Sequence, residues 1–367
     1  MATHPHLPPQ SCTHFHTALP FEAARHIPGL RADHPAEAPY TRLHGHSFLA
    51  TLRCALPTGY APYPGGELET LQAQWRAELD RLDYRLINDH IAAPTDLAIA
   101  RWLRAQCQVA GMAQVALHST PQRGIELGAD GAAQAWRRYA FQSAHQLPMV
   151  PVGHKCGNMH GHGFEVILHT QLADGADPLD SGYGALDAAW APLHAALNYA
   201  CLNDLAGLEN PTSEIMSSWI WNRLLPTLPT LTKVTVFETA SCGAVFDGSH
   251  YRIWKDLTLD SALRFKSAPP GHPRQRLHGH TYTLRLHLSA PLDQMMGWTV
   301  DFGDVKTLFN PVFKALDHQP LHQISDLADC DSATVAAWIL NKARTDLPQI
   351  NRVDLMETAG LGVSVRA

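Results

Sequence analysis

The sequence lacks the features that mark membrane, secreted and nucleic-acid-binding proteins. It has no apolar run of about 18 residues, as a membrane-spanning helix would need, and its N-terminus lacks the charged-then-apolar pattern of a signal peptide. Its 28 Lys and Arg against 34 Asp and Glu include no basic block, so nothing attracts nucleic acid or an anionic membrane surface. Seven cysteines form no Cys-x-x-Cys pair, which argues against a disulfide framework. We therefore expect a cytoplasmic protein with no nucleic-acid or membrane partner.

Charged residues are also scarce, at 17%, whereas hydrophobic residues make up 45% of the 367-residue chain. This composition is typical of a globular protein with a substantial core, and the length predicts two or three domains. Histidine is the residue in excess. The chain has 23 of them, more than a core needs, since histidine is only intermediate in its tendency to be buried. The histidines therefore indicate where to look for chemistry.

A repeated tripeptide divides the chain into three parts. His-Gly-His occurs at residues 44–46, 160–162 and 278–280, so its copies begin 116 and 118 residues apart. A fixed period indicates tandem structural modules, and we place three of them at residues 10–128, 132–247 and 250–366. Nearly the same step separates three tryptophans in apolar helical stretches and three threonines that follow strand-like runs, namely Trp102, Trp219, Trp338, Thr120, Thr239 and Thr358.

Each module shows the pattern strand, strand, two helices, strand and a last short strand. The alternation of apolar and polar residues is plainest at Leu284, Leu286 and Leu288, which is the period of a half-buried strand. Such an element order predicts an α+β fold, an antiparallel four-stranded sheet with two helices on one face. Three sheets in one chain can close edge to edge into a barrel, which removes the exposed sheet edges.

Three histidines of the second module have the spacing of a metal site. His160 and His162 are two residues apart on an expected strand, so both side chains point to one face. His145 alone is more often a structural residue, but beside this pair on a neighbouring strand it completes a three-imidazole set for Zn²⁺ with one position open. Cys156, near these ligands, is a candidate for a lowered pKa and acid-base work; its alternative is a buried small apolar side chain.

The second module also carries a series of longer motifs in a fixed order. They are FxxAHxLP at 141–148, GHKCGNxHGHxF at 153–164, CLNDxxGLENPTSE at 201–214 and VFET at 236–239. Together they closely resemble the 6-carboxytetrahydropterin synthase branch of the 6-pyruvoyltetrahydropterin synthase family. The short spacing between the cysteine and His-Gly-His is similar to that branch rather than to the pyruvoyl-forming one.

The resemblance implies a fold, a metal and an activity. Members are small zinc enzymes of the tunnelling fold, whose trimers close into a twelve-stranded barrel, and the three modules would form that trimer within one chain. Zn²⁺ would be held by His145, His160 and His162. The implied reaction converts 7,8-dihydroneopterin triphosphate to 6-carboxytetrahydropterin, acetaldehyde and triphosphate, an early step toward queuosine and other 7-deazapurines.

The family's catalytic Asp-His dyad is present in the third module and missing from the second. The second module reads Asn198-Tyr199 where the third reads Asp317-His318. The resemblance implies that Cys156 and His318 move protons and that Asp317 orients His318. It also implies a Glu-Thr pair that grips the pterin ring, which is either Glu238 with Thr239 or Glu357 of the third module; we favour Glu238.

The modules have lost different parts of the family's site. The third module lacks the first zinc histidine and the cysteine, and the first module lacks most of the set; the residues in those places are Leu263, Arg274, Arg25, Tyr40, Tyr84 and Ser119. Because the losses are complementary, we predict one composite active site between the second and third modules and a structural first module. The resemblance also implies that two chains pair as a homodimer of pseudo-trimers.

The sequence is also compatible with two other functions. One alternative is a sister activity on the same pterin, giving a pyruvoyl product or a simpler dihydropterin by side-chain cleavage. The other is a non-catalytic pterin-binding protein, suggested by the losses in the first and third modules.

Overall fold

The computed structural model describes residues 12–33, 37–173, 179, 181–292, 301–327 and 330–367; the expected start of the first module at residue 10 lies outside them. Apart from the two-residue strands β3 and β8, its strands form one antiparallel sheet that closes because β1 pairs with β14. The first third of the chain contributes β1 (Cys12–Arg25), α1 (Ala38–Thr41), β2 (His44–Cys54), α2 (Glu67–Leu79), β3 (Arg85–Leu86), α3 (Asp96–Gln106), β4 (Met112–Thr120) and β5 (Arg123–Gly128).

The other two thirds repeat this order. The second contributes β6 (Ala133–His145), β7 (His160–Gln171), α4 (Tyr183–Leu197), β8 (Ala200–Cys201), α5 (Ser213–Leu224), β9 (Leu231–Thr239) and β10 (Cys242–Phe246). The third contributes β11 (Tyr251–Leu263), β12 (His278–Leu288), α6 (Phe302–Leu316), α7 (Ser332–Ala343), β13 (Ile350–Thr358) and β14 (Leu361–Arg366). The predicted α+β architecture of three modules around one barrel is confirmed.

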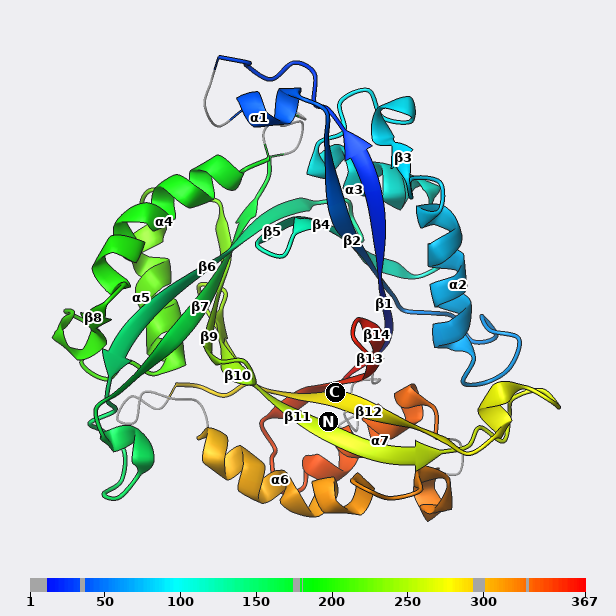
Figure 1. Cartoon of the computed structure of the whole chain (residues 1–367). Helices are drawn as coiled ribbons and strands as arrows, with labels where there is room; N and C mark the ends of the chain where they lie inside the picture. The colour runs from blue at the N-terminus through cyan, green and yellow to red at the C-terminus, as the bar shows by residue number, and fades with distance from the viewer. Residues whose placement is uncertain (1–11, 34–36, 174–178, 180, 293–300, 328–329) are drawn as a thin grey trace, which may run out of the picture.

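The helices cover the outside of the barrel, and the strands surround a central tunnel (Figure 1). Alternation along the strands explains this arrangement. In β2, for example, Phe48, Ala50 and Leu52 face the helices and are buried, while the intervening side chains point into the tunnel. Full burial of a side chain such as Leu or Phe contributes roughly 1.5–3 kcal/mol. The modules meet at three seams, where β5 pairs with β6, β10 with β11, and β14 with β1.

The three His-Gly-His copies lie at the same end of the barrel, which we call the histidine rim. Each copy begins the second long strand of its module, and its first histidine is paired in register with the last residue of the preceding long strand. These pairs are Arg25 with His44, His145 with His160, and Leu263 with His278. The register therefore confirms that Arg25 and Leu263 occupy the places equivalent to His145.

A left-handed residue follows the first long helix of each module and lies at this rim. Tyr84, Tyr199 and His318 have φ angles of 53°, 59° and 57°, a region that residues other than glycine seldom adopt. In each case the backbone N–H donates to a carbonyl of the module's first strand at 2.6 Å. The side chains of both tyrosines are more than four-fifths exposed, so the strained turn holds them outward.

Local sequence signals set the start of the second helix of each module. Thr95, Thr212 and Asp331 are the N-caps of α3, α5 and α7, and each side chain accepts a hydrogen bond from a backbone N–H of the first turn. In the second module this cap fixes the buried Glu214 in the first turn of α5. Among the described residues, none of the helices combines the length and apolar character that crossing a bilayer requires.

Candidate metal centre and active site

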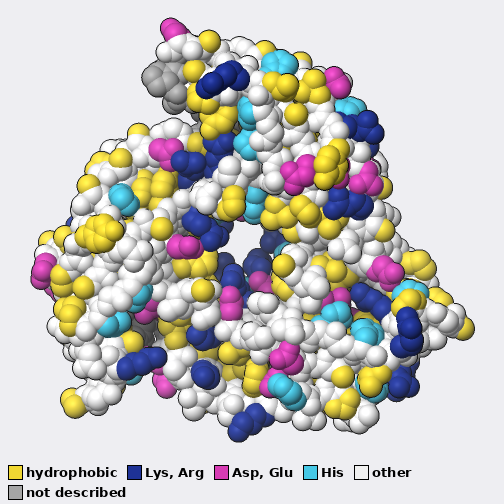
Figure 2. Space-filling view, in the orientation of Figure 1, with side chains coloured by type: hydrophobic (Ala, Val, Ile, Leu, Met, Phe, Trp, Pro, Cys, Tyr) yellow, Lys and Arg dark blue, Asp and Glu magenta, His cyan; other side chains and the backbone are white. Residues whose placement is uncertain are grey.

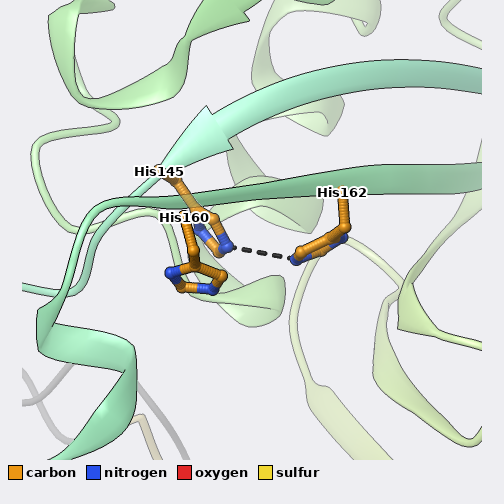
Figure 3. Close-up of side chains that lie close together, drawn as sticks. All are labelled: His145, His160 and His162. Carbon is orange, nitrogen blue, oxygen red and sulfur yellow. Dashed lines mark hydrogen bonds between the residues drawn. The ribbon is translucent and has the colours of Figure 1, made fainter.

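His145, His160 and His162 converge at the histidine rim. His145 comes from the end of β6 and the other two from the start of β7, and their rings turn toward one another (Figure 3). His145 Nε2 lies 3.2 Å from His162 Nε2, and one ligand atom from each residue lies within 4.8 Å of the others. His145 is buried, whereas the other two are partly exposed, so the open side of the cluster faces outward.

The far nitrogens of the same rings are held by the backbone. His160 Nδ1 lies 2.8 Å from the Asn158 carbonyl and His162 Nδ1 lies 3.0 Å from the Gly163 carbonyl. A carbonyl accepts a hydrogen bond, so each Nδ1 carries a proton and each Nε2 is left to face the cluster. Burial and the two neighbouring imidazoles lower the pKa of His145 to about 4, so it is neutral near pH 7.

This arrangement fits a zinc ion. Tetrahedral Zn²⁺ with bonds of about 2.0–2.1 Å to nitrogen needs ligand atoms about 3.3 Å apart, close to the 3.2 Å between His145 and His162. Metal binding also requires neutral imidazoles, which the low pKa of His145 provides. Three protein ligands leave a fourth position open, as in catalytic zinc sites.

A cavity of about 470 Å³ lies at the seam between the second and third modules. The second module contributes Cys156 and Glu238 to its wall, and Glu238 lies near enough to His160 and His162 for their charge to lower its pKa. Further lining residues come from both modules and include Thr212, Glu214, Thr239, Ser241, Cys242, Lys255, Asp301, Phe302 and Lys306. The cavity thus joins the carboxylate and the thiol beside the histidine cluster.

The protein groups around this cavity raise the pKa of both acids. Burial, followed by the charge of Glu238, raises the pKa of the Cys156 thiol, and Lys155 opposes the shift. The lowered pKa expected for Cys156 is therefore not produced by the protein groups alone. Burial also raises the pKa of Glu238, and the nearby Asp301 adds to it. Glu238 accepts no hydrogen bond from the described residues, so its carboxyl group is available to a ligand.

The Asp-His dyad of the third module does not line this cavity. Asp301, which does, is the N-cap of α6, whereas Asp317 is its C-cap, and a helix of 15 residues separates its ends by about 22 Å. His318, which is hydrogen-bonded to Asp317, instead lines a depression at the histidine rim beside His280. Within one chain, the structure therefore does not place the dyad against Cys156 as we expected.

Asp317 and His318 do form a pair. His318 Nδ1 lies 2.9 Å from Asp317 Oδ2, and the His318 side chain is 76% exposed. The hydrogen bond from His318 to Asp317 raises the pKa of the imidazole. Asp317 also accepts from the Asp260 backbone N–H, and this contact together with His318 lowers the pKa of its carboxyl despite the opposing effect of burial.

The two other seams are closed by internal ion pairs. In the third module, Glu357 binds Arg274 at 3.2 Å and accepts from Ser332 at 2.7 Å. In the first module, Arg25 binds Asp96 at 2.7 Å, and both side chains are almost fully buried. Glu357, named as a possible pterin anchor, is thus already occupied by protein groups.

Sequence reasoning missed the lysines that the third module contributes to the cavity. Lys255 on β11 donates to Ser241 at 3.1 Å, and Lys306 lies on the exposed face of α6. Neither residue belongs to a local motif, so only the pairing of β10 with β11 could have identified Lys255. Asp301, the N-cap of α6, also reaches the cavity from the third module.

Comparison with known proteins identifies the class of protein. The family described as 6-pyruvoyl tetrahydropterin synthase matches residues 134–249 and again 252–367, which together exceed half of the chain. The protein therefore belongs to this family. The matched segments are the two modules that border the cavity.

Individual relatives match about one module each. A Synechocystis protein named 6-carboxy-5,6,7,8-tetrahydropterin synthase is 32% identical over 116 residues, covering 30% of this chain and 88% of the relative. A Pyrococcus furiosus protein named dihydroneopterin monophosphate aldolase is 31% identical over 94 residues, covering 25% and 79%. The structure of Caenorhabditis elegans 6-pyruvoyl tetrahydropterin synthase covers 32% of this chain and 94% of its own at 17% identity, with a TM-score of 0.30.

Proposed function

We propose that this protein is a zinc-dependent lyase of the pterin side chain, acting in the cytoplasm as a 6-carboxytetrahydropterin synthase. The substrate would be 7,8-dihydroneopterin triphosphate and the products 6-carboxytetrahydropterin, acetaldehyde and triphosphate, on the route to queuosine and other 7-deazapurines. The observation that carries the proposal is the cluster of three convergent imidazoles beside a seam cavity that holds an unoccupied glutamate and a cysteine.

Glu238 and Thr239 are the proposed pterin anchor. A carboxylate is an acceptor only, so it matches two neighbouring N–H donors on the edge of a pterin ring. Glu238 is supported over Glu357 because Glu357 already binds Arg274 and Ser332. Lys255 and Lys306 reach the same cavity from the third module and are the proposed contacts for the phosphate groups.

Proton transfer is assigned to Cys156 and His318. Zn²⁺ held by His145, His160 and His162 would supply Lewis-acid polarisation of the side-chain hydroxyl groups. Cys156 remains protonated near pH 7 in the protein environment, because burial raises its pKa, so it can give a proton before it accepts one. Asp317 keeps His318 oriented and stabilises its charged form.

The dyad would reach the metal centre from a second chain. His318 is exposed at the histidine rim, and the depression beside His162 at the same rim is lined by Tyr199 and open to solvent. The apolar residues that precede each His-Gly-His, Leu43, Met159 and Leu277, are all more than half exposed there. An isologous two-fold pairing of rims would set module 2 of one chain against module 3 of its partner, and module 1 against module 1.

The product test is mass spectrometry after incubation of the zinc-loaded protein with 7,8-dihydroneopterin triphosphate and an acetaldehyde trap. Acetaldehyde with 6-carboxytetrahydropterin supports the proposal. A simpler dihydropterin would favour side-chain cleavage instead, the alternative suggested by the Pyrococcus aldolase, and a pyruvoyl product would assign the sister synthase activity. Bound but unchanged substrate would indicate a pterin-binding protein.

The two-chain site has its own test. Cys156→Ala and His318→Ala should each be inactive, and a mixture of the two, unfolded and refolded together, should regain activity because mixed dimers contain one intact site. The matched control mixes Cys156→Ala with His162→Ala, whose defects lie in the same half-site and should not complement. Failure of the first pair to recover activity, with mixed dimers present, would contradict the two-chain arrangement.

A further inference from the structure

The tunnel wall carries charges that the proposed reaction does not use. Lys and Arg side chains surround the central opening of the molecule (Figure 2). Some of these cations have their own carboxylate. Arg138 binds Glu165 at 2.9 Å, and Arg285 binds Asp256 through two contacts of 2.6 and 2.7 Å. Pairing of this kind neutralises each charge locally and needs no ligand.

Four further arginines gather at the end of the tunnel opposite the histidine rim. They are Arg53 on β2, Arg252 on β11, Arg352 on β13 and Arg366 on β14, and we call them the tunnel arginines. Their sequence neighbours Leu52, Ile253, Val353 and Val365 are fully buried against the helices, so strand alternation points the arginines into the tunnel.

The pairing of the strands brings like charges together at this end. Arg352 and Arg366 are direct register partners in β13 and β14. Across β1, Arg53 lies opposite His16, which is itself paired with Gly362 of β14. Like charges placed directly opposite on a sheet destabilise it, so this cluster costs free energy unless an anion compensates it.

Among the described residues, one carboxylate, Asp354, forms an ion pair with a tunnel arginine, and its acceptor positions are filled. Asp354 accepts from Arg352 at 2.5 and 2.8 Å, from Ser364 at 2.6 Å and from His287 at 2.9 Å. A carboxylate has about four acceptor positions, so Asp354 has none left. Within the described ranges, Arg53, Arg252 and Arg366 consequently have no ion pair and no side-chain hydrogen bond.

The electrostatics of the neighbouring groups agree with this geometry. Burial, and then the charge of Arg352, lowers the pKa of Arg53, Arg252 and Arg366. Burial also lowers the pKa of His16 to about 3, with Arg352 and Arg53 adding to the effect and Asp354 opposing it. Glu126 opposes the pKa shift of Arg53, and Asp247 opposes that of Arg252, but among the described residues neither carboxylate forms an ion pair with a tunnel arginine. The region therefore holds an excess of positive charge beside a neutral imidazole.

We propose that the tunnel arginines bind a multivalent phosphate-type anion, with the chemistry of pyrophosphate or triphosphate, inside the barrel. Planar guanidinium groups bind phosphate oxygens through paired, charge-assisted hydrogen bonds, and three free guanidinium groups suit an anion of several charges. The site differs from the catalytic cavity. Lys255, which lines that cavity, is three residues from Arg252 on β11, so strand alternation points the two side chains to opposite faces of the sheet. The proposal does not depend on the proposed function.

Isothermal titration of the full chain with inorganic triphosphate tests this site, with Arg252→Gln and Arg366→Gln as variants. Each should weaken the tunnel binding about tenfold or more, and binding to the wild type should weaken steeply with salt. The control is Arg101→Gln, which removes the same charge from the exposed face of α3 and should bind as the wild type does.

Thermal unfolding is a second measurement, and it distinguishes an arginine that binds an anion from one that only stabilises the fold. Without anion at low salt, Arg366→Gln should melt above the wild type because repulsion is relieved, and triphosphate should raise its Tm less. Equal binding by the wild type and the Arg252→Gln/Arg366→Gln double variant would overturn the proposal. So would binding that only Lys255→Ala and Lys306→Ala abolish, since the anion would then lie in the seam cavity.

Discussion

In the second module, His145 lies opposite His160 at the end of β6, and in the first module Arg25 holds the equivalent place opposite His44 at the end of β1. The contacts of the two residues are parallel. His145 Nε2 lies 3.2 Å from His162 Nε2, and Arg25 Nη2 lies 3.0 Å from His46 Nε2. A guanidinium group therefore occupies, in the first module, the place where the second could hold a metal ion.

The difference shows how one fold can keep or lose a metal site. Arg25 brings its own positive charge, and the buried Asp96 balances it with further hydrogen bonds from Ser119 and from Tyr183 across the seam. Although burial opposes it, Arg25 and then Arg123 lower the pKa of Asp96 to about 2. The first seam is thus satisfied internally, whereas the second keeps the neutral His145 and a Glu238 that accepts no hydrogen bond from the described residues.

The largest effect should come from the metal ligands. Purified wild-type protein should contain about one zinc per chain by three-histidine ligation, and His145→Ala should lose both the metal and turnover. His46→Ala, the matched change in the first module, should keep the zinc content. Metal analysis by mass spectrometry checks both variants. Close to three zinc ions per wild-type chain, or zinc loss in His46→Ala, would contradict the claim that only the second module holds a metal ion.

Arg25→Ala should destabilise the protein by about 3–5 kcal/mol, because it removes the partner that lies 2.7 Å from the buried Asp96 and leaves only Arg123, at 3.9 Å. Chemical denaturation measures this change. The double variant Arg25→Ala/Asp96→Ala also removes the carboxylate that lost its partner, so it should recover part of the lost free energy of unfolding. A single-variant effect below about 1 kcal/mol would mean that Arg25 does not replace a metal's charge in this seam.

Glu238→Gln should lower kcat/KM by about ten- to a hundredfold, since hydrogen bonds to charged groups contribute about 1.5–3 kcal/mol each. Glu357→Gln should change it less than about twofold, because Glu357 binds Arg274 and Ser332 instead of substrate. Steady-state kinetics on the two variants decides which glutamate anchors the pterin. Equal losses would mean that the third seam also binds substrate.

The smallest effect concerns His318. NMR titration of the wild type should place its pKa above the ordinary value, because Asp317 stabilises the charged imidazole. In Asp317→Asn the pKa should fall, so His318 loses its proton at lower pH and is less charged near neutrality. His322 of the same module, whose pKa burial lowers, serves as the internal control. An unmoved His318 would contradict the orienting role of Asp317.

Much of the fold follows from local patterns in the sequence. The repeated His-Gly-His, the period-2 strands and the helix caps each concern residues close in the chain, and together they predicted three α+β modules around one barrel. The histidine cluster could be predicted for the same reason. His160 and His162 share a face by strand geometry, and a tight antiparallel pair brings His145 opposite them. The roles of Cys156, Asp317 and His318 stay predictions.

Only the tertiary structure decided what meets across the seams and inside the tunnel. Lys255, Asp301 and Lys306 reach the cavity because β10 pairs with β11, and His318 lies at the far end of α6 from that cavity. The tunnel arginines come from four strands of two modules. Local periodicity sets which face of a strand a residue occupies, but closure of the barrel sets its neighbours, and that depends on register between segments hundreds of residues apart.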